Sequence, residues 1–161
     1  KVSNLLDESS IRLPLAVAEK EEAIESLVDC LVANGRLEPS LRETALRAVL
    51  ARERSLSTGM ERGVALPHGV VDALADPLCA LGVHPGGLDF ASLDGAPAHL
   101  VVLFLLPRNR YQGHIAMLAG VARLLHDGAL LDRLKAAPSA SDALRMLSEA
   151  DRAANGGGAA S

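Results

Sequence analysis

Aromatic side chains are scarce in this sequence. Its 161 residues include two Phe, one Tyr and no Trp. Proteins that bind single-stranded nucleic acid stack bases on aromatic side chains, so this class is disfavoured. The basic excess that a phosphate-backbone binder needs is also missing, because 20 acidic residues outweigh 16 basic ones and give a formal net charge of −4. We therefore expect no nucleic-acid partner.

Several motifs and long apolar runs are absent as well. Cys30 and Cys79 form no CxxC pair, and no histidine has a partner at metal-ligand spacing, so neither a redox motif nor a metal site is predicted. The glycine-bearing stretch at 59–63 matches no nucleotide-binding pattern, so we expect no cofactor. No apolar run approaches about 18 residues, and the first residues lack a signal-peptide pattern. The expectation is a cytoplasmic protein.

The composition that is present is that of one globular domain. Hydrophobic residues make up 49% and charged residues 22%, and a chain of this length can bury a substantial core. The C-terminal residues are rich in Gly, Ala and Ser, which favours disorder. We therefore predict a single domain over residues 1–152 and a disordered tail over 153–161.

Hydrophobic periodicity predicts an α/β (α+β) fold in three layers. A strand over Ile11–Leu15 lies at a sheet edge because it contains Pro14. Two helices follow, the first starting at Glu19–Glu22 and ending near Gly35, the second starting with a capping box of Ser40 and Glu43.

Three strands and three helices are predicted in the remainder of the chain. The strands are Val64–Leu66, Leu78–Val83 with a turn at Pro85–Gly87, and the continuous apolar run Leu100–Leu106, which is typical of a strand buried on both faces. The helices cover about 111–126, the region of Leu130–Leu134, and a segment that starts at Ser139 and Asp142. The order β-αα-βββ-ααα indicates a small mixed sheet with helices on both faces.

His68 has the most unusual placement of any reactive side chain. It follows the predicted strand Val64–Leu66 and Pro67, and it lies between Gly63 and Gly69. A strand end delivers a side chain to a fixed position, and neighbouring glycines let a ligand approach closely. A loop histidine without a role is the alternative, and its placement alone does not decide between the two.

His114 and Arg52 are weaker candidates on their own. His114 shares a predicted helix face with Leu118, Val121 and Leu125, near a helix N-terminus that attracts anions. A partly buried histidine bonded to a backbone carbonyl is the simpler interpretation. Arg52 ends the second helix just before the glycine-bearing loop, and its guanidinium suits a phosphoryl group or carboxylate. A solvated helix-end charge is the alternative there.

The stretch from Ser57 to Gly69, STGMERGVALPHG, resembles the active-site signature of the type-2 IIA proteins of the bacterial phosphoenolpyruvate-dependent sugar phosphotransferase system. The resemblance runs from about Leu5 to Ala150. It includes the Arg52-Glu53 pair before the loop, the turn at 93–95, and His114 at the start of a helix. The residues at 60–62, Met-Glu-Arg, depart from the Gly and Asn that family members often carry, and this departure bears on partner contacts.

The resemblance implies a role for each candidate residue. His68 is then the phosphorylated histidine, His114 the second active-site histidine that hydrogen-bonds the first or its phosphoryl group, and Arg52 the cation that faces the phosphoryl oxygens. It also implies the mixed sheet between helical layers, no cofactor, and phosphoryl transfer without a metal, since positioning and positive charge are the main requirements. A neutral histidine ring at cytoplasmic pH is a competent nucleophile.

Two functions from different classes follow from the resemblance. The first is a phosphocarrier that accepts a phosphoryl group from phospho-HPr and passes it to a IIB partner in fructose-like sugar uptake, with the membrane involved only through a IIC transporter. The second is a nitrogen-type regulatory protein whose phosphorylation state controls its binding to other proteins. The 161 residues contain neither a IIB nor a IIC segment, so the acceptor is expected to be a separate protein. A relative that keeps the fold without phosphorylation is a third alternative, disfavoured by the intact His68, His114 and Arg52.

Overall fold

The computed structural model describes residues 2–156. The helices are α1 (Lys20–Ala33), α2 (Arg42–Ser55), α3 (Tyr111–Leu125), α4 (Gly128–Lys135) and α5 (Ala140–Gly156). The strands are β1 (Ile11–Arg12), β2 (Val64–Ala65), β3 (His68–Val70), β4 (Leu78–Leu88) and β5 (Ala98–Leu106). Short 3-10 turns cover Val2–Asn4, Glu8–Ser10 and Pro39–Leu41.

The strands form one mixed sheet in the order β1-β4-β5-β2. β3 pairs with the same edge of β5 as β2, further along that strand. The β4–β5 pairing is antiparallel, whereas β1, β2 and β3 each run parallel to their neighbour. β1 lies at the edge of the sheet, as predicted, but it is shorter than the predicted strand and ends at Arg12, before Pro14. The predicted strand Val64–Leu66 is present as β2, and a further strand that was not predicted, β3, follows it along β5.

The central strand β5 separates two hydrophobic cores. Leu100, Val102 and Phe104 pack with the apolar side chains of α3, α4 and α5. Val101 and Leu103 pack on the opposite face with α1 and α2. Alternation of side chains along a strand produces this division, so a run with no polar residue requires a cover on both faces.

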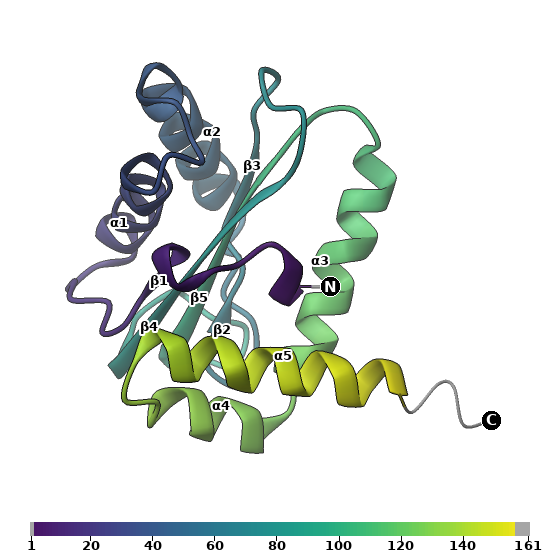
Figure 1. The fold of residues 1–161 in the computed structure, drawn as a ribbon. Coiled ribbons are helices and arrows are strands. Elements are labelled where there is room, and N and C mark those ends of the chain that lie inside the picture. Colours follow the sequence, from purple (N-terminus) through teal and green to yellow (C-terminus); the bar gives the residue numbers. More distant parts are fainter. Residues whose placement is uncertain (1, 157–161) are drawn as a thin grey trace.

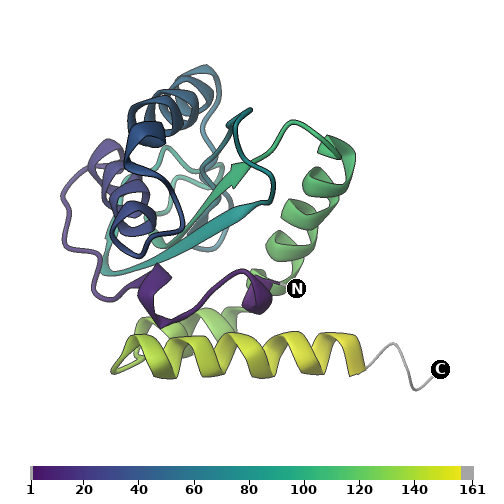
Figure 2. The same ribbon diagram turned by 45° about the horizontal axis from the view of Figure 1, so that its top comes forward.

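Helices therefore cover both faces of the sheet, and the predicted three-layer α/β architecture is confirmed (Figure 1). α1 and α2 lie together on one side of the sheet, and α3 lies on the other with α4 and α5 below it in the same view. The rotated view shows the same separation, with α5 running along the molecule opposite α1 and α2 (Figure 2).

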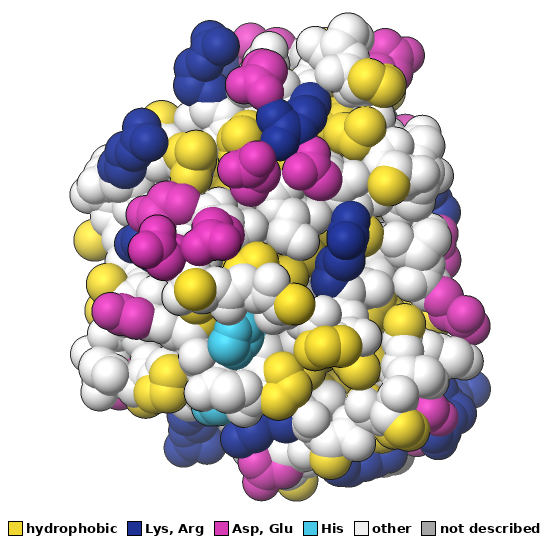
Figure 3. Space-filling view, turned by 90° about the vertical axis from the view of Figure 1, so that its left-hand side faces the viewer, with side chains coloured by type: hydrophobic (Ala, Val, Ile, Leu, Met, Phe, Trp, Pro, Cys, Tyr) yellow, Lys and Arg dark blue, Asp and Glu magenta, His cyan; other side chains and the backbone are white. Residues whose placement is uncertain are grey.

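Charged side chains hold the two helices of the first layer together. Arg42 pairs with Asp29 and Glu25 of α1 and with Glu43 of its own helix. Hydrogen bonds from Arg42 to Asp29, and then to the other carboxylates, raise the pKa of the guanidinium. Acidic and basic side chains are mixed over this face of the molecule (Figure 3), which is typical of a solvated surface.

Two local predictions from the sequence are wrong. The capping box of Ser40 and Glu43 does not form: a 3-10 turn covers Pro39–Leu41, and α2 begins one residue later with Leu41 at its N-cap and no side-chain cap. Pro39 suits the first position of such a turn, which displaces the helix start. The turn expected at Pro85–Gly87 is instead an irregularity inside β4, where the pairing with β5 shifts between Val83 and Leu88.

The end of α5 changes the predicted domain boundary. The helix continues through Gly156, so residues 153–156, which we assigned to the tail, are helical. Ala153 and Ala154 have high helix propensity and extend the last turns. The rest of the expected tail, 157–161, lies outside the described residues.

Within residues 2–156, no single helix is long and apolar enough to cross a membrane. α3 and α4 pass the length and composition criteria only as a pair bent by 81°. The apolar side chains of this pair, including Leu118, Leu125 and Leu134, pack in the core between β5 and the helices α3, α4 and α5.

Candidate functional site

The pairing register determines which face of the sheet His68 occupies. His68 opens β3 opposite Phe104, and Gly69 lies opposite Leu105. Partners in a parallel pair point to the same face, and Phe104 belongs to the core shared with α3. His68 therefore points toward the α3 side, whereas Gly69 faces α2, where a Cβ would lie 2.9 Å from the Val49 nitrogen.

A backbone carbonyl fixes the ring of His68. Nδ1 lies 2.9 Å from the carbonyl oxygen of Leu66, and the half-buried side chain keeps contact with solvent. A carbonyl oxygen only accepts hydrogen bonds, so Nδ1 carries the ring hydrogen. The lone pair is then on Nε2, which makes that nitrogen the nucleophile of this histidine.

His114 occupies the first turns of α3, on the same side of the sheet as His68. It is half-buried, and the predicted face of Leu118, Val121 and Leu125 is buried against the core. Its Nε2 is buried without a hydrogen-bond partner among the described residues. A buried donor or acceptor without a partner is costly, so this nitrogen is suited to bind a polar group that enters the site.

Arg52 lies in the last turn of α2, on the other helical layer. One of its guanidinium nitrogens, Nη1, donates to the carbonyl oxygen of Leu56 at 2.7 Å. The half-buried guanidinium thus has further N–H groups available for an anion. Among the described residues, no hydrogen bond joins the side chains of Arg52, His68 and His114.

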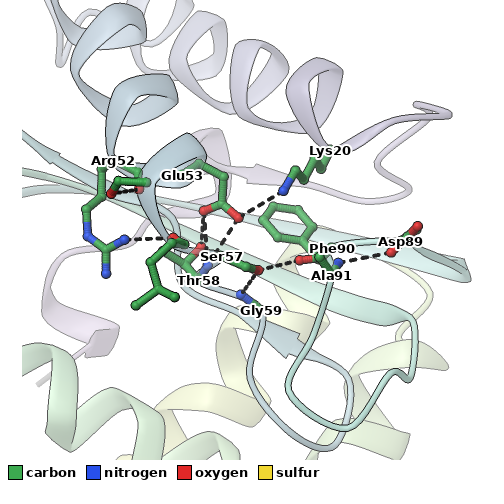
Figure 4. A network of polar contacts seen from close by, with 11 residues as sticks. Lys20, Arg52, Glu53, Ser57, Thr58, Gly59, Asp89, Phe90 and Ala91 are labelled. Atoms are coloured by element: carbon green, nitrogen blue, oxygen red, sulfur yellow. Dashed lines mark hydrogen bonds and ion pairs between the residues drawn. The ribbon is translucent and has the colours of Figure 1, made fainter.

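A buried carboxylate beside Arg52 organises the loop that precedes β2. Glu53 is 4% exposed and accepts hydrogen bonds from the backbone N–H and the hydroxyl of Thr58. Lys20 at the start of α1 lies 3.5 Å from the same carboxylate (Figure 4). The sequence marked Glu53 only as part of the Arg-Glu pair; a charged residue on the buried side of α2 was the available signal.

A second loop, at residues 90–92, packs closely against the loop at residues 57–59. Ser57 donates from its hydroxyl to the carbonyl oxygen of Phe90 and accepts from the N–H of Gly59 (Figure 4). A Cβ on Gly59 would lie 2.8 Å from the Phe90 oxygen and 2.7 Å from Ser92 Oγ. The residue at 59 must therefore be glycine for the two loops to meet.

The departure of residues 60–62 from the family signature carries a backbone cost. Arg62 has a φ of 63°, the left-handed region in which Gly and Asn are favoured. Its N–H donates to Asp94 Oδ2 at 3.0 Å. Hydrogen bonds from the N–H groups of Arg62 and then Ala96 hold the pKa of Asp94 below its ordinary value. This contact ties the loop to the turn at 93–95, which the sequence predicted.

The other histidines and both cysteines have structural surroundings. His84 Nε2 lies 2.8 Å from the Val17 oxygen, and His99 Nδ1 lies 3.0 Å from the His84 oxygen. Cys30 and Cys79 are buried, and burial raises the pKa of the Cys79 thiol. His84 Nδ1 is also buried without a hydrogen-bond partner among the described residues. The signature motif, and not the hydrogen bonding, therefore keeps His68 and His114 as the candidates for chemistry.

A known protein family matches most of the chain. The family described as "Phosphoenolpyruvate-dependent sugar phosphotransferase system, EIIA 2" matches residues 4–150. The chain belongs to this family. Its five helices and five-stranded mixed sheet are those of a type-2 IIA protein, a phosphoryl-transfer component of the system.

Two relatives carry fructose-specific names. The chain is 32% identical over 148 residues to the "PTS system fructose-specific EIIA component" of Haloferax volcanii, covering 92% of this chain and 95% of that protein. It is 31% identical over 152 residues to the "PTS system fructose-specific EIIABC component" of Bacillus subtilis. That alignment covers 94% of this chain but only 24% of the longer protein.

Two solved structures share the fold of this chain and are also similar to it in sequence. The nitrogen regulatory protein IIA-Ntr from Neisseria meningitidis superposes with a TM-score of 0.80 at 25% identity, covering 91% of this chain and 98% of that one. The Escherichia coli complex of enzyme IIAMtl with phosphorylated enzyme IIBMtl gives a TM-score of 0.74 at 27% identity, covering 89% and 97%. Sugar-specific and nitrogen-regulatory proteins are thus both among the relatives.

Proposed function

We propose that this chain is a phosphocarrier that takes a phosphoryl group from phospho-HPr on Nε2 of His68 and passes it to a IIB protein in fructose-type sugar uptake. The observation that carries the proposal is the hydrogen bond from Nδ1 to the Leu66 carbonyl. This hydrogen bond leaves the lone pair on Nε2. His68 is the first residue of β3, and its side chain lies on the face of the sheet toward α3.

The transfer step needs only groups that this chain and its donor provide. The lone pair of His68 Nε2 forms a bond to the phosphorus of the donor's phosphohistidine, and the phosphorus–nitrogen bond of the donor breaks. The donor ring keeps that electron pair. The hydrogen of His68 stays on Nδ1, donated to the Leu66 carbonyl oxygen, so the phosphorylated ring carries a positive charge next to the negative charge of the phosphoryl group. Positive charge around the equatorial oxygens is the main remaining requirement.

We assign that stabilisation to three groups of this chain: Arg52, the N-terminus of α3 and His114. The free N–H groups of Arg52 suit phosphoryl oxygens. The N-terminus of α3 adds a partial positive charge next to His114, whose buried Nε2 lacks a partner. A phosphoryl oxygen in reach of that nitrogen satisfies it, and this supports the role of His114 as the second active-site histidine.

Replacement of His114 by alanine is expected to leave His68 able to accept a phosphoryl group but to slow acceptance and onward transfer. Loss of one hydrogen bond to the transferring group costs about 10²–10³-fold in rate, by analogy with single donors that stabilise other charged transition states. Rapid-quench measurement of both steps checks the expectation. Wild-type rates of both acceptance and onward transfer would remove His114 from the site.

The acceptor is proposed from the solved complex. In the Escherichia coli structure a IIA protein of this fold is bound to a phosphorylated IIB protein. The likeness of that IIA protein to this chain supports a IIB-type acceptor here. The fructose-specific names of two relatives support fructose as the sugar class.

The proposal is tested by incubating the chain with phosphoenolpyruvate, Enzyme I and HPr, followed by intact-mass analysis and peptide mapping. The expected result is one acid-labile phosphoryl group on His68 that appears only when HPr is present. No modification, with an upstream relay shown to be active on a known IIA protein, would contradict it.

The likeness to IIA-Ntr supports a second candidate function, in which the phosphorylation state of His68 controls binding to a regulatory target. The two functions differ in the fate of the phosphoryl group. Rapid transfer from the phosphorylated chain to a fructose-type IIB protein favours sugar uptake. A phosphorylated chain that resists such transfer favours regulation.

A further inference from the structure

The carboxylate of Glu53 is connected to the ring of His68 through two intervening residues. Its first link is to Thr58, whose N–H lies 3.1 Å and 3.2 Å from the two carboxylate oxygens and whose hydroxyl also donates to the carboxylate. Thr58 is itself buried, at 8% exposure. Three polar groups of two residues are thus fixed against one another away from solvent.

The next links run across a short antiparallel pairing of the loop with β2. The N–H of Leu66 donates to the carbonyl oxygen of Thr58 at 3.1 Å, and Gly59 bridges to Ala65 in the same pairing. The carbonyl oxygen of Leu66 then accepts from Nδ1 of His68 at 2.9 Å. The sequence Glu53, Thr58, Leu66, His68 is therefore joined by a hydrogen bond at each step.

We propose that Glu53 is a positioning residue for phosphoryl transfer: through Thr58 and Leu66 it holds the carbonyl that keeps hydrogen on Nδ1 of His68 and the lone pair on Nε2. The inference rests on the proposed function of His68 as the nucleophile. The coupling is geometric, since the links pass through residues and not through single peptide groups. Displacing Thr58 shifts Leu66, and the Leu66 carbonyl is what orients the ring.

Close contacts with neighbouring residues fix the position of the loop at residues 57–59. Gly59 meets Phe90 and Ser92 at distances that leave no room for a Cβ, and Ser57 bonds the Phe90 carbonyl. Lys20 lies over the Phe90 ring at 5.9 Å while it pairs with Glu53. The Lys20 ammonium neutralises the carboxylate and docks α1 on the same assembly (Figure 4).

The competing explanation is that Glu53 only stabilises the fold. The test uses the full chain with Glu53→Gln, Thr58→Val and Thr58→Ser. Glu53→Gln loses one acceptor and the charge, Thr58→Val loses the hydroxyl, and Thr58→Ser keeps both donors. Leu147→Ala, in the core on the α5 side, lowers stability without touching these contacts and is the matched control.

Two readouts separate positioning from stability. The first is the ring tautomer of His68, read from its ¹⁵N chemical shifts in the unphosphorylated protein. The second is phosphoryl transfer from phospho-HPr, with kcat and KM measured separately. We expect Glu53→Gln and Thr58→Val to lose the uniform Nδ1–H tautomer and to lower kcat roughly tenfold or more at nearly constant KM, since small displacements of a reacting group carry effects of this order.

Thr58→Ser and Leu147→Ala are expected to keep the wild-type tautomer and kcat. A wild-type tautomer and kcat in Glu53→Gln and Thr58→Val, with only a lower unfolding midpoint, would overturn the proposal. A tautomer change in Leu147→Ala to the same extent would also overturn it. Because the tautomer is read without phosphorylation, a chain that HPr fails to phosphorylate would refute the proposed function while the role of Glu53 is still decided.

Discussion

Replacement of His68 by alanine is expected to abolish phosphoryl acceptance completely. The reason is that the proposed function requires a covalent bond between the phosphoryl group and Nε2, and alanine has no atom that replaces this nitrogen. His114 does not substitute, because its Nε2 is buried inside the site and its backbone is fixed in α3. The measurement is phosphoenolpyruvate-dependent labelling through Enzyme I and HPr, read by intact mass before and after acid treatment.

The matched control is His126→Ala. The side chain of His126 is exposed at the end of α3, and only its backbone oxygen contacts Arg62. We expect normal labelling in this variant and an unchanged unfolding midpoint in both variants. Normal acid-labile labelling of His68→Ala would show that another residue is the acceptor and would refute the assignment of the nucleophile.

Gly69→Ala is expected to lower the free energy of unfolding by about 1–3 kcal/mol, which is the usual cost of forcing extra volume into a packed interior. The new Cβ would lie 2.9 Å from the Val49 nitrogen and 3.0 Å from the Ala48 carbonyl carbon. Both are backbone atoms, so no side-chain rotation relieves the contact and α2 must move away from β3. Urea unfolding followed by circular dichroism measures the loss.

The same displacement is expected to slow phosphoryl acceptance, because α2 carries Arg52 and Glu53 while β3 carries His68. The control is Gly120→Ala in α3, where the nearest atom to a new Cβ is Arg123 Nη2 at 3.8 Å. Alanine is favoured over glycine within a helix, so this variant should gain up to about 1 kcal/mol. An unfolding curve of Gly69→Ala that coincides with the wild type would show that the α2–β3 contact is not tight.

Local patterns predicted the layers of the fold correctly. The apolar run Leu100–Leu106 indicated a strand buried on both faces, and β5 does divide two cores. The spacing of Leu118, Val121 and Leu125 predicted the buried face of α3. Ser139 was expected to open the last helix, and its hydroxyl accepts from the N–H of Asp142 at 3.1 Å. Each of these features depends on residues that are neighbours along one element.

Two of the errors fall where pairing between distant segments decides the outcome, and the third has a local cause. His68–Val70 has too few residues to show a strand pattern, and β3 exists because β5 offers its backbone groups in register. The glycines at 86 and 87 predict a turn on their own, but pairing with β5 continues on both sides of them and makes an irregular strand. The capping signal at Ser40 and Glu43 was overridden by the turn that starts at Pro39.

The sequence by itself determined the family and the two-sided cover of the central strand, and it singled out His68 as the candidate nucleophile, because a signature motif and hydrophobic periodicity are local properties. Only the tertiary structure decided that His68 points to the α3 face, that its Nδ1 is held by Leu66, and that Glu53 is buried under Thr58. The physical reason is that a hydrogen bond or a buried charge depends on which groups meet across the sheet. Those meetings are set by the packing of α2, β3 and the loops, and not by the order of residues along any one of them.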